Sequence, residues 1–298
     1  MSVLPTFADE AGPGRSKAAG QAAKLDQAAV LGAVREDVRQ TLRMGWIDPA
    51  FDARSAHPAF ITAGWSAARP NVGRSFIALT KAIREEAVST LQPLVGASVL
   101  RRDLRPSLSD EELRRVEEVT RAVHVAMPKV QLVVHAMYRA ARRERIDGTG
   151  REEPPIRRGV PEWQRWMAAQ SIAEESRAIL EETANAFAVP APPATFRLMA
   201  RWPAALSGLW ERVRTASQHE RWKRGAGQVR RVALRGMGTL PHPVELQWIA
   251  LKDRGLGEPE RLQLLSVMRA LDAAMAPQTM IATFAWLAMG APEIGSEG

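Results

Sequence analysis

The segment "TFRLMARWPAALSGLW", residues 195–210, is a second version of "AFDARSAHPAFITAGW", residues 50–65. At a constant offset of 145 residues the two share a phenylalanine, a proline, an alanine and a tryptophan, namely Phe51/Phe196, Pro58/Pro203, Ala59/Ala204 and Trp65/Trp210. A segment repeated at this distance indicates two copies of a domain-sized unit. We therefore interpret the chain as a duplicated unit whose halves bury their apolar faces on each other.

Two further matches extend the repeat. "AVREDV" (33–38) corresponds to "AILEET" (178–183) at the same offset, and "RAVHVAM" (121–127) corresponds to "RALDAAM" (269–275) at an offset of 148, which needs only a small loop insertion. The division that follows is a flexible N-terminal tail at 1–29, a first helical repeat at 30–142, a basic linker with the start of the second repeat at 143–174, a second helical repeat at 175–290, and a flexible C-terminal tail at 291–298.

The long segments have helical periodicity. Apolar residues keep one face over Val30–Leu42 and another over Phe76–Leu94. Ser109 with Glu112 three residues later forms a capping-box pattern, which predicts the start of a helix. We expect Pro128 to end or kink that helix, because proline removes a backbone hydrogen bond. Segments with β-strand alternation are missing, so the predicted fold is all-α, with two pseudo-twofold-related repeats packed into one bundle.

Composition excludes several classes of protein. The 298 residues are 46% hydrophobic and 25% charged, which is typical of a globular protein. Cysteine is absent, which excludes disulfides and thiol nucleophiles. No apolar run is long enough to cross a membrane, and the first 29 residues lack the apolar region of a signal peptide. We expect a cytoplasmic protein that does not associate with membranes.

The formal net charge of +8 raises the question of nucleic-acid binding. The excess lies in 139–158, which also contains acidic residues and loop-forming Gly and Pro, and in 221–235, where apolar residues separate the charges. The chain has one Tyr and seven Phe, and no aromatic-basic recognition motif. We interpret both segments as solvated surface and rank nucleic-acid binding last.

Motifs for metal or cofactor chemistry are missing. No pair of the five histidines has HExxH geometry, and the glycine-containing "RGMGTLP" (235–241) lacks the Lys and Ser/Thr of a phosphate-binding loop. No GxSxG segment indicates a serine hydrolase. We expect neither a metal ion nor a cofactor. His124 falls beside the apolar stripe of its helix, and a structural or surface role is favoured over a catalytic one.

The pattern "VREDVRQTLRMGW" (34–46), the segments "HPAF…W" and "RWPA…W", and "MPK" (127–129) together resemble the group I, or DehI-type, 2-haloacid dehalogenases. The resemblance covers nearly the whole chain after the first 29 residues. It implies an all-α pseudo-dimer, often a true homodimer, with the active site between the halves. In that family an Asp activates water, which displaces halide from the α-carbon of a short 2-haloacid without a covalent ester intermediate.

Residue by residue, the site implied by the resemblance is only partly present. The pocket Trp is retained as Trp46, whereas the other five positions differ: Pro49 replaces a Phe, Met127 replaces the Asn that positions water, Ala194 and Thr195 replace the Ser-Asp pair that supplies the base, and Leu271 replaces a Tyr. A Thr hydroxyl is no substitute for a carboxylate base at neutral pH. Hydrolytic dehalogenation by the family mechanism is therefore in doubt.

Asp48 is the carboxylate nearest to the implied pocket. One interpretation is a relocated base contributed by the first repeat. The other, which the sequence favours, is that Asp48-Pro49 simply starts a turn.

The leading hypothesis is a protein related to the haloacid dehalogenases, whose cleft between the repeats binds a small carboxylated or apolar molecule. Thr195 and Asp48 are its candidate catalytic residues, and the walls are formed by Trp46, Pro49, Met127, Ala194 and Leu271. The main alternative is a non-catalytic structural or interaction protein on the same scaffold.

Overall fold

The computed structural model describes residues 13–51, 57–96, 99–154, 156–168, 171–189 and 191–291, with side chains described from residue 28 onward. Within these ranges all regular secondary structure is helical. The only β-type pairing there is an isolated bridge between Ile146 and Val244. The predicted all-α fold is confirmed. Residues 1–12 and 292–298, which belong to the two predicted tails, lie outside the described residues.

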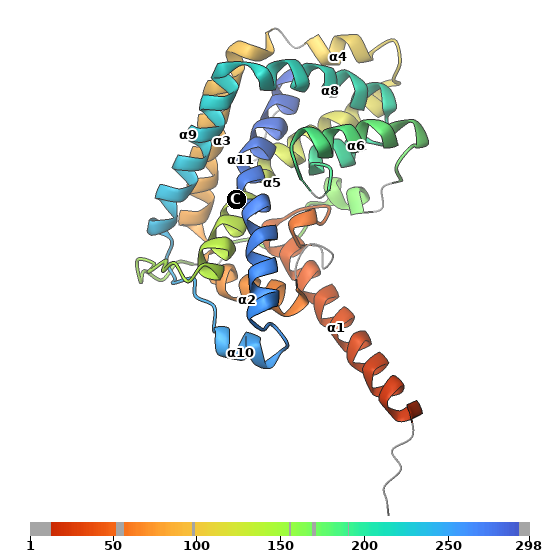
Figure 1. The fold of residues 1–298 in the computed structure, drawn as a ribbon. Helices are drawn as coiled ribbons and strands as arrows, with labels where there is room; N and C mark the ends of the chain where they lie inside the picture. Colours follow the sequence, from red (N-terminus) through yellow and green to blue (C-terminus); the bar gives the residue numbers. More distant parts are fainter. Residues whose placement is uncertain are drawn as a thin grey trace, which may run out of the picture.

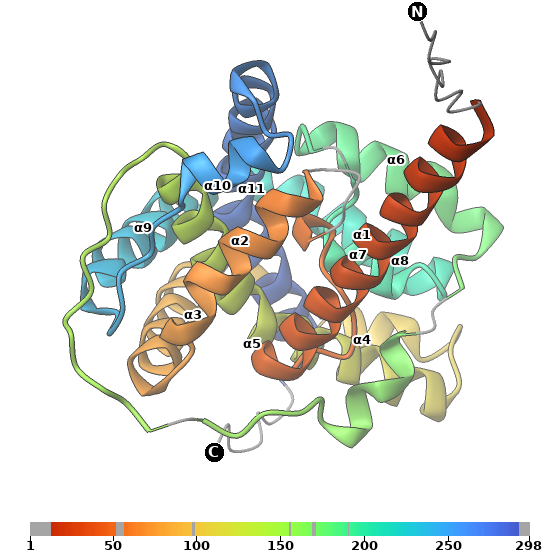
Figure 2. The ribbon, with the colours of Figure 1, turned by 90° about the horizontal axis from the view of Figure 1, so that it is seen from below.

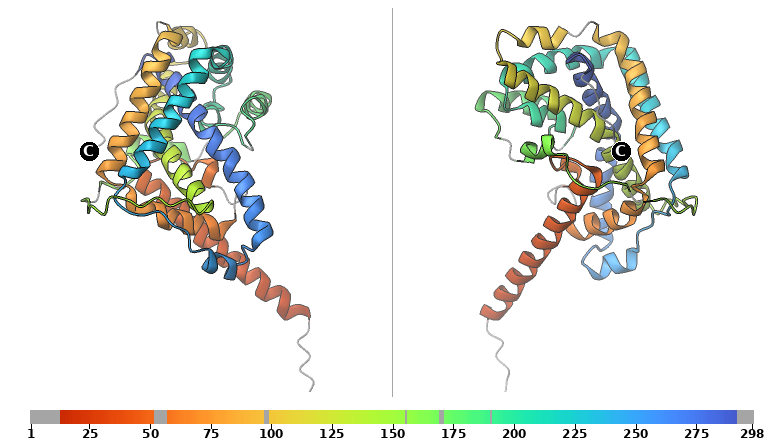
Figure 3. Two further views of the ribbon diagram at one scale, coloured as in Figure 1. Left: turned by 60° about the vertical axis from the view of Figure 1, so that its left-hand side comes forward. Right: turned by 180° about the vertical axis from the view of Figure 1, so that it is seen from behind.

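Two long helices form the centre of the molecule. α5 (Asp110–Ala141) and α11 (Glu258–Ala288) pack against each other, and nearly every residue of the middle of each is buried. α3 (Arg74–Val95) and α9 (Glu220–Gly236) lie side by side against this pair, as the views in Figures 1 and 3 show. One continuous apolar core therefore runs through both halves of the chain.

The shorter helices surround this centre. α2 (Pro58–Ala68) packs on α1 (Pro13–Leu42) and α5, and α4 (Val99–Leu104) packs on α8 (Pro203–Gln218). The remaining helices are α6 (Arg177–Ala186), α7 (Ala194–Met199) and α10 (Trp248–Asp253), together with the 3₁₀ helices η1 (Pro49–Phe51), η2 (Arg69–Asn71), η3 (Glu162–Ala168), η4 (Glu174–Ser176) and η5 (Met237–Thr239).

Two helices run further than the sequence pattern indicates. α1 begins at Pro13, within the segment expected to be a tail, and its first half projects from the body in Figure 1. α5 begins at the predicted Ser109–Glu112 capping box but continues through Pro128 to Ala141. The lost hydrogen bond at Pro128 does not end α5, because the helix is buried on both sides of the proline. α11 likewise continues through Pro277.

The repeated segments make similar local contacts. Phe51 and Trp65 meet edge to face with ring centroids 6.3 Å apart, and Phe196 and Trp210 do so at 5.7 Å. The matched prolines occupy the first turns of α2 and α8, where a missing N–H costs no helical hydrogen bond. These contacts explain why the Phe, Pro and Trp recur, while the duplication of the whole unit stays a prediction.

The linker between the halves runs along the outside of the molecule (Figure 2). Backbone hydrogen bonds join Thr149 N to Leu240 O at 2.8 Å and Gly159 N to Gln40 O at 2.8 Å. The linker is thus attached to the second half near η5 and to the first half at α1. Its final part, η3, returns to the interior and contributes to the candidate site.

Candidate functional site

The tight turn after α1 carries Trp46 and Asp48. The backbone N–H of Ala50 donates to Asp48 Oδ1 at 2.9 Å, and the N–H of Phe51 donates to the carbonyl of Asp48 at 2.9 Å. Asp48 therefore starts the short helix η1, as the Asp-Pro pattern predicts. This turn role uses only one of the two carboxylate oxygens.

α7 faces this turn from the second half of the chain. Pro193 precedes the helix, and the side chains of Ala194 and Thr195 in its first turn are buried. Ala194, Arg197 and Leu198 have the i, i+3, i+4 spacing that places them on one helical face. That face is directed toward Trp46, because all four residues line the same cavity.

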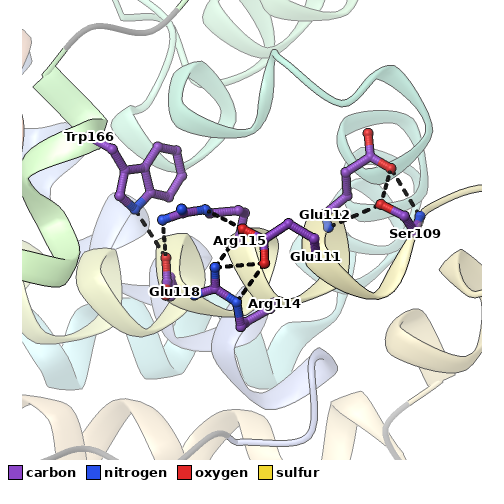
Figure 4. A network of polar contacts seen from close by, with 7 residues as sticks. All are labelled: Ser109, Glu111, Glu112, Arg114, Arg115, Glu118 and Trp166. Carbon is purple, nitrogen blue, oxygen red and sulfur yellow. Dashed lines mark hydrogen bonds and ion pairs between the residues drawn. The ribbon is translucent and has the colours of Figure 1, made fainter.

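η3 supplies the third wall and is fixed to α5 by polar and aromatic contacts (Figure 4). The indole N–H of Trp166 donates to Glu118 Oε2 at 3.0 Å, and the Arg115 guanidinium lies 4.9 Å from the centre of the Trp166 ring. Arg121 stacks on Trp163 at 3.9 Å in the same way. These contacts hold the wall formed by the end of η3 in place.

The Glu118 network extends back to the start of α5. Glu118 accepts hydrogen bonds from Arg114 and Arg115, and Glu111 accepts from both arginines as well (Figure 4). Because Glu118 is nearly buried while Glu111 is exposed, the charge of Glu118 is neutralised where solvent cannot do so. The network thus gives the Trp166 N–H a fixed acceptor.

The cavity between these three elements has a volume of about 140 Å³ and an apolar lining with a single charged group. Its walls are Trp46, Ile47, Met167, Ala168, Ile172, Ala194, Arg197 and Leu198. Only Arg197 among them carries a charge. The space is therefore suited to a small molecule with one anionic group and an apolar remainder.

Asp48 follows Ile47 in the turn but does not itself line the cavity. Its side chain is 1% exposed, and its Oδ2 has no hydrogen-bond partner among the described residues. Burial raises the pKa of Asp48 to about 6, against the opposing effects of the Ala50 N–H and the positive charge of Arg197. A buried carboxylate with a raised pKa and a free oxygen is typical of a functional group.

The indole of Trp46 presents a second buried polar atom without a partner. Its Nε1 finds no acceptor among the described residues, although a buried indole N–H normally has one. Trp46 and Asp48 are two residues apart in one turn, so an unpaired donor and an unpaired acceptor occur in the same short segment.

The other predicted site residues lie in different places. Thr195 is buried in the first turn of α7 but does not line the cavity. Pro49 begins η1, and Met127 and Leu271 are buried within α5 and α11. None of these three contributes to the cavity walls, and Met127 and Leu271 belong to the apolar core instead.

Arg197 and the wall formed by η3 are not among the site residues predicted from the sequence. Arg197 could have been found from the helical spacing that places it on the same face as Ala194. No sequence signal indicated that Met167 and Ala168, which lie in the predicted linker region at 143–174, would line the site. That return depends on the tertiary contacts of η3 with α5.

His124 is buried, which corrects its expected place at the edge of the apolar stripe. Its ring stacks on Trp286 at 4.2 Å, and its Nδ1 lies 3.1 Å from Thr283 Oγ1. Burial, together with the charge of Arg84, lowers the pKa of His124 to about 3. A neutral imidazole packed on α11 is a structural group.

A larger groove of about 550 Å³ lies elsewhere, between α3, α4, α8 and α11. Two of its polar side chains make local contacts: Arg212 donates to Asp103 and to the Gly208 carbonyl, and His219 caps α9. Within the described part of the chain, no group of three His, Cys, Asp or Glu residues could hold a metal ion, and no helix could cross a membrane.

The all-α architecture with paired long helices is similar to the fold of solved D-2-haloacid dehalogenases. A solved D-2-haloacid dehalogenase mutant with D-2-CPA superimposes with a TM-score of 0.76 at 16% identity, covering 87% of this chain and 91% of that one. A second mutant structure of a D-2-haloacid dehalogenase superimposes with a TM-score of 0.73 at 17% sequence identity, covering 85% of this chain and 90% of that one. A D-2-haloacid dehalogenase in complex with L-LA superimposes with a TM-score of 0.74 at 16% sequence identity, covering 88% of this chain and 91% of that one.

At this level of identity the likeness establishes the fold. No protein-family model matches the sequence, and no curated protein matches it either. The chemistry must therefore be argued from the residues of the cavity.

Proposed function

We propose that the cavity binds a small 2-substituted carboxylic acid and that the protein is a hydrolase related to the 2-haloacid dehalogenases. The observation that carries the proposal is the cavity between Trp46 and α7, in which Arg197 is the only charged lining residue. The resemblance assigns the pocket to the same two segments, through Trp46 and Ala194.

The chemistry of the lining fits this substrate class. A guanidinium pairs well with a carboxylate, and Arg197 is exposed enough to meet one entering from solvent. The remaining walls are apolar and suit a halogen or a methyl group. The cavity volume of about 140 Å³ is smaller than that of a typical drug-sized ligand pocket, so the cavity suits a small ligand.

A second candidate is a binding protein that keeps the scaffold without catalysis. It is favoured by the side chains at Thr195 and Met127, neither of which can act as a base or strongly bind water. Under this alternative the cavity still binds a carboxylate, but wild type releases no halide. Activity that appears only in a Thr195→Asp variant would support it.

The test is chloride release from both enantiomers of 2-chloropropionate, with binding of unreactive propionate measured by calorimetry. We expect wild type to bind propionate and to release chloride. Arg197→Gln should weaken binding at least tenfold, the cost of one charge-assisted pair. Arg214→Gln, which removes an exposed arginine that pairs with Glu182 on α6, is the matched control. Wild type that neither binds propionate nor releases chloride would refute the proposal.

A further inference from the structure

α9 carries most of the net positive charge of the chain. It has six basic residues and one acidic residue, Glu220, so its formal net charge is +5, against +8 for the whole chain. All six basic residues are exposed, and they are Arg221, Lys223, Arg224, Arg230, Arg231 and Arg235. The buried residues of the helix lie on its other side, where α9 packs on α3 and α11. The charges therefore lie on the outer face of α9, at the edge of the molecule in Figure 1.

Gly227 lies at the centre of this outer face. In a helix, the residues three and four positions away in both directions are the neighbours of a residue on the surface. At Gly227 all four of these neighbours are basic, and they are Lys223, Arg224, Arg230 and Arg231. Apart from the backbone of the helix itself, a Cβ at Gly227 would have one described atom within 4 Å, Nη1 of Arg231 at 3.9 Å. The face thus has a position without a side chain, surrounded by cationic groups.

Packing explains one glycine of α9 but not this one. A Cβ at Gly225 would lie 2.1 Å from Thr90 Cγ2 on α3, so the packing of the two helices requires glycine there. Among the described residues no such contact is made at Gly227, although glycine lowers the stability of a helix relative to alanine. Glycine also allows another molecule to approach the backbone closely. An anion that approaches at Gly227 reaches the surface of the helix with four cationic groups around it.

These cationic groups keep donors for an anion. Lys223 pairs with Glu220 at 2.8 Å, and the Lys223 side chain is still 57% exposed. Arg230 pairs with Asp272 at 2.6 Å and is 44% exposed. Arg231 donates to a neutral side-chain amide one turn before it at 3.2 Å. Because an ammonium has three N–H donors and a guanidinium has five, the contacts within the protein leave donors that face solvent.

The shape of the face favours an extended anion. Residues 221–235 span about 21 Å along the helix at 1.5 Å per residue, which is the length of about six base pairs of a duplex at 3.4 Å each. Arginine binds phosphate groups with paired hydrogen bonds. The apolar residues Trp222, Val229 and Ala233 are buried, so α9 has no apolar face to insert into a membrane. A phosphate backbone fits these features better than a lipid surface does.

We propose that the outer face of α9 binds the phosphate backbone of a nucleic acid duplex around Gly227, without reading the base sequence. The exposed residues of α9 include no aromatic side chain for stacking on bases, so contacts to phosphates supply the binding. The sequence pattern at 221–235 favours a solvated surface. The glycine at the centre of the charges, which packing does not explain, is the observation that favours a binding surface. The inference is independent of the cavity and of the function proposed for it.

The experiment measures the affinity for a fluorescein-labelled DNA duplex of about 20 base pairs by fluorescence anisotropy, at KCl concentrations from about 50 to 300 mM. Wild type is compared with the double variant Arg224→Gln/Arg231→Gln and with Gly227→Glu and Gly227→Gln. The matched control is Arg177→Gln/Arg214→Gln, which removes two exposed arginines that each pair with a glutamate at α6, on the opposite side of the molecule from α9 (Figures 1 and 2). Circular dichroism and urea titration check that each variant is folded.

We expect wild type to bind the duplex, with the logarithm of the association constant falling by about 3 to 4 per tenfold increase in salt, as about four phosphate contacts require. The variant Arg224→Gln/Arg231→Gln should bind about tenfold more weakly or worse at low salt, and its salt dependence should decrease by about two. Gly227→Glu should bind about tenfold more weakly than Gly227→Gln, because its carboxylate repels phosphate and pairs with the surrounding cations. The control should differ from wild type by less than about twofold.

Three results with the duplex would overturn the inference. They are a wild type that does not bind it at low salt, a control double variant that loses as much affinity as the double variant of α9, and equal affinities of Gly227→Glu and Gly227→Gln. Vesicles of phosphatidylcholine with phosphatidylserine are the second probe, measured by co-sedimentation. Binding to these vesicles without binding to the duplex would assign the face to an anionic membrane and would also overturn the inference.

Discussion

His135 on α5 and Asp272 on α11 form a buried pair at the centre of the molecule, with Nδ1 and Oδ1 2.5 Å apart. Thr279 donates to Gln131 Oε1 at 2.7 Å, so the amide NH₂ of Gln131 faces His135 Nε2 at 3.2 Å. His135 Nε2 is therefore the acceptor, and Nδ1 carries the proton that is donated to Asp272. Arg230 donates to the second oxygen of Asp272 at 2.6 Å.

A second contact between the same helices corresponds to this pair. At the offset of 148, His124 matches Asp272 and His135 matches Thr283. The His124–Thr283 contact therefore corresponds to the Asp272–His135 contact with the roles of α5 and α11 interchanged. Gln131 and Thr279, which match each other at this offset, bond between the two pairs. These matched contacts lie between α5 and α11, and the duplication of the whole unit stays a prediction.

Asp272→Asn should destabilise the protein by roughly 2–4 kcal/mol, because it weakens hydrogen bonds from two partners to a buried charge. Urea titration at pH 7 measures the effect. Asp103→Asn also breaks a hydrogen bond from an arginine, but at an exposed site, and should cost less than about 1 kcal/mol. If the two variants lost the same free energy of unfolding, the larger effect expected for the buried Asp272 would be contradicted.

The effect of Asp272 should also depend on pH. Burial alone would raise the pKa of Asp272, but the hydrogen bonds and charges of His135 and Arg230 outweigh burial and hold it below the usual 3.8. The ionised form therefore stabilises the fold above about pH 4, and the contribution disappears as the pH falls through the lowered pKa. The difference in stability between wild type and Asp272→Asn should accordingly shrink in strong acid.

Asp48 should have the opposite effect on stability. Its pKa is raised from 3.8 to about 6, so the folded protein binds the proton more tightly than the unfolded chain does. Stability contributed by the neutral form is present below pH 4 and is lost as the pH rises through 6. Relative to Asp48→Asn, wild type should lose about 3 kcal/mol between pH 4 and 8, measured by urea titration. A pH-independent difference would contradict the burial of an ionisable Asp48.

The Trp166–Glu118 contact should control the cavity wall formed by η3. Trp166→Phe keeps the ring and removes the hydrogen bond at 3.0 Å, which should weaken propionate binding about threefold to tenfold and increase hydrogen exchange over 162–168. Trp248→Phe is the control, because its indole N–H has no partner among the described residues. Unchanged exchange in Trp166→Phe would show that the stacking contacts suffice.

Gly45→Ala should disturb the same wall from the other side. A Cβ at Gly45 would lie 2.1 Å from the Gln164 carbonyl oxygen, and the Gly45 N–H donates to Gln164 Oε1 at 3.0 Å. We expect a loss of about 1–3 kcal/mol by urea titration and weaker propionate binding. Gly32→Ala meets no atom within 4 Å and should be neutral or stabilising by up to about 1 kcal/mol.

The sequence by itself determined the helices. Their apolar periodicity, the Ser109–Glu112 capping box, and the prolines in the first turns of α2 and α8 act within a few residues of the chain, so they can be read locally. The same local reading placed the turn at Asp48. At Pro128 it left an end or a kink open, and α5 continues through the proline because the residues on both sides of it are buried.

Only the tertiary structure decided which residues meet at the site. His135 and Asp272 are 137 residues apart, and the wall of η3 reaches Gly45 across 119 residues. Burial also decided the chemistry of Asp48. An Asp-Pro turn in solvent has an ordinary carboxylate, whereas the buried Asp48 has a raised pKa and one oxygen without a hydrogen-bond partner among the described residues. The desolvation of a carboxylate depends on all residues that surround it in the folded protein, and a local sequence pattern does not show which residues these are.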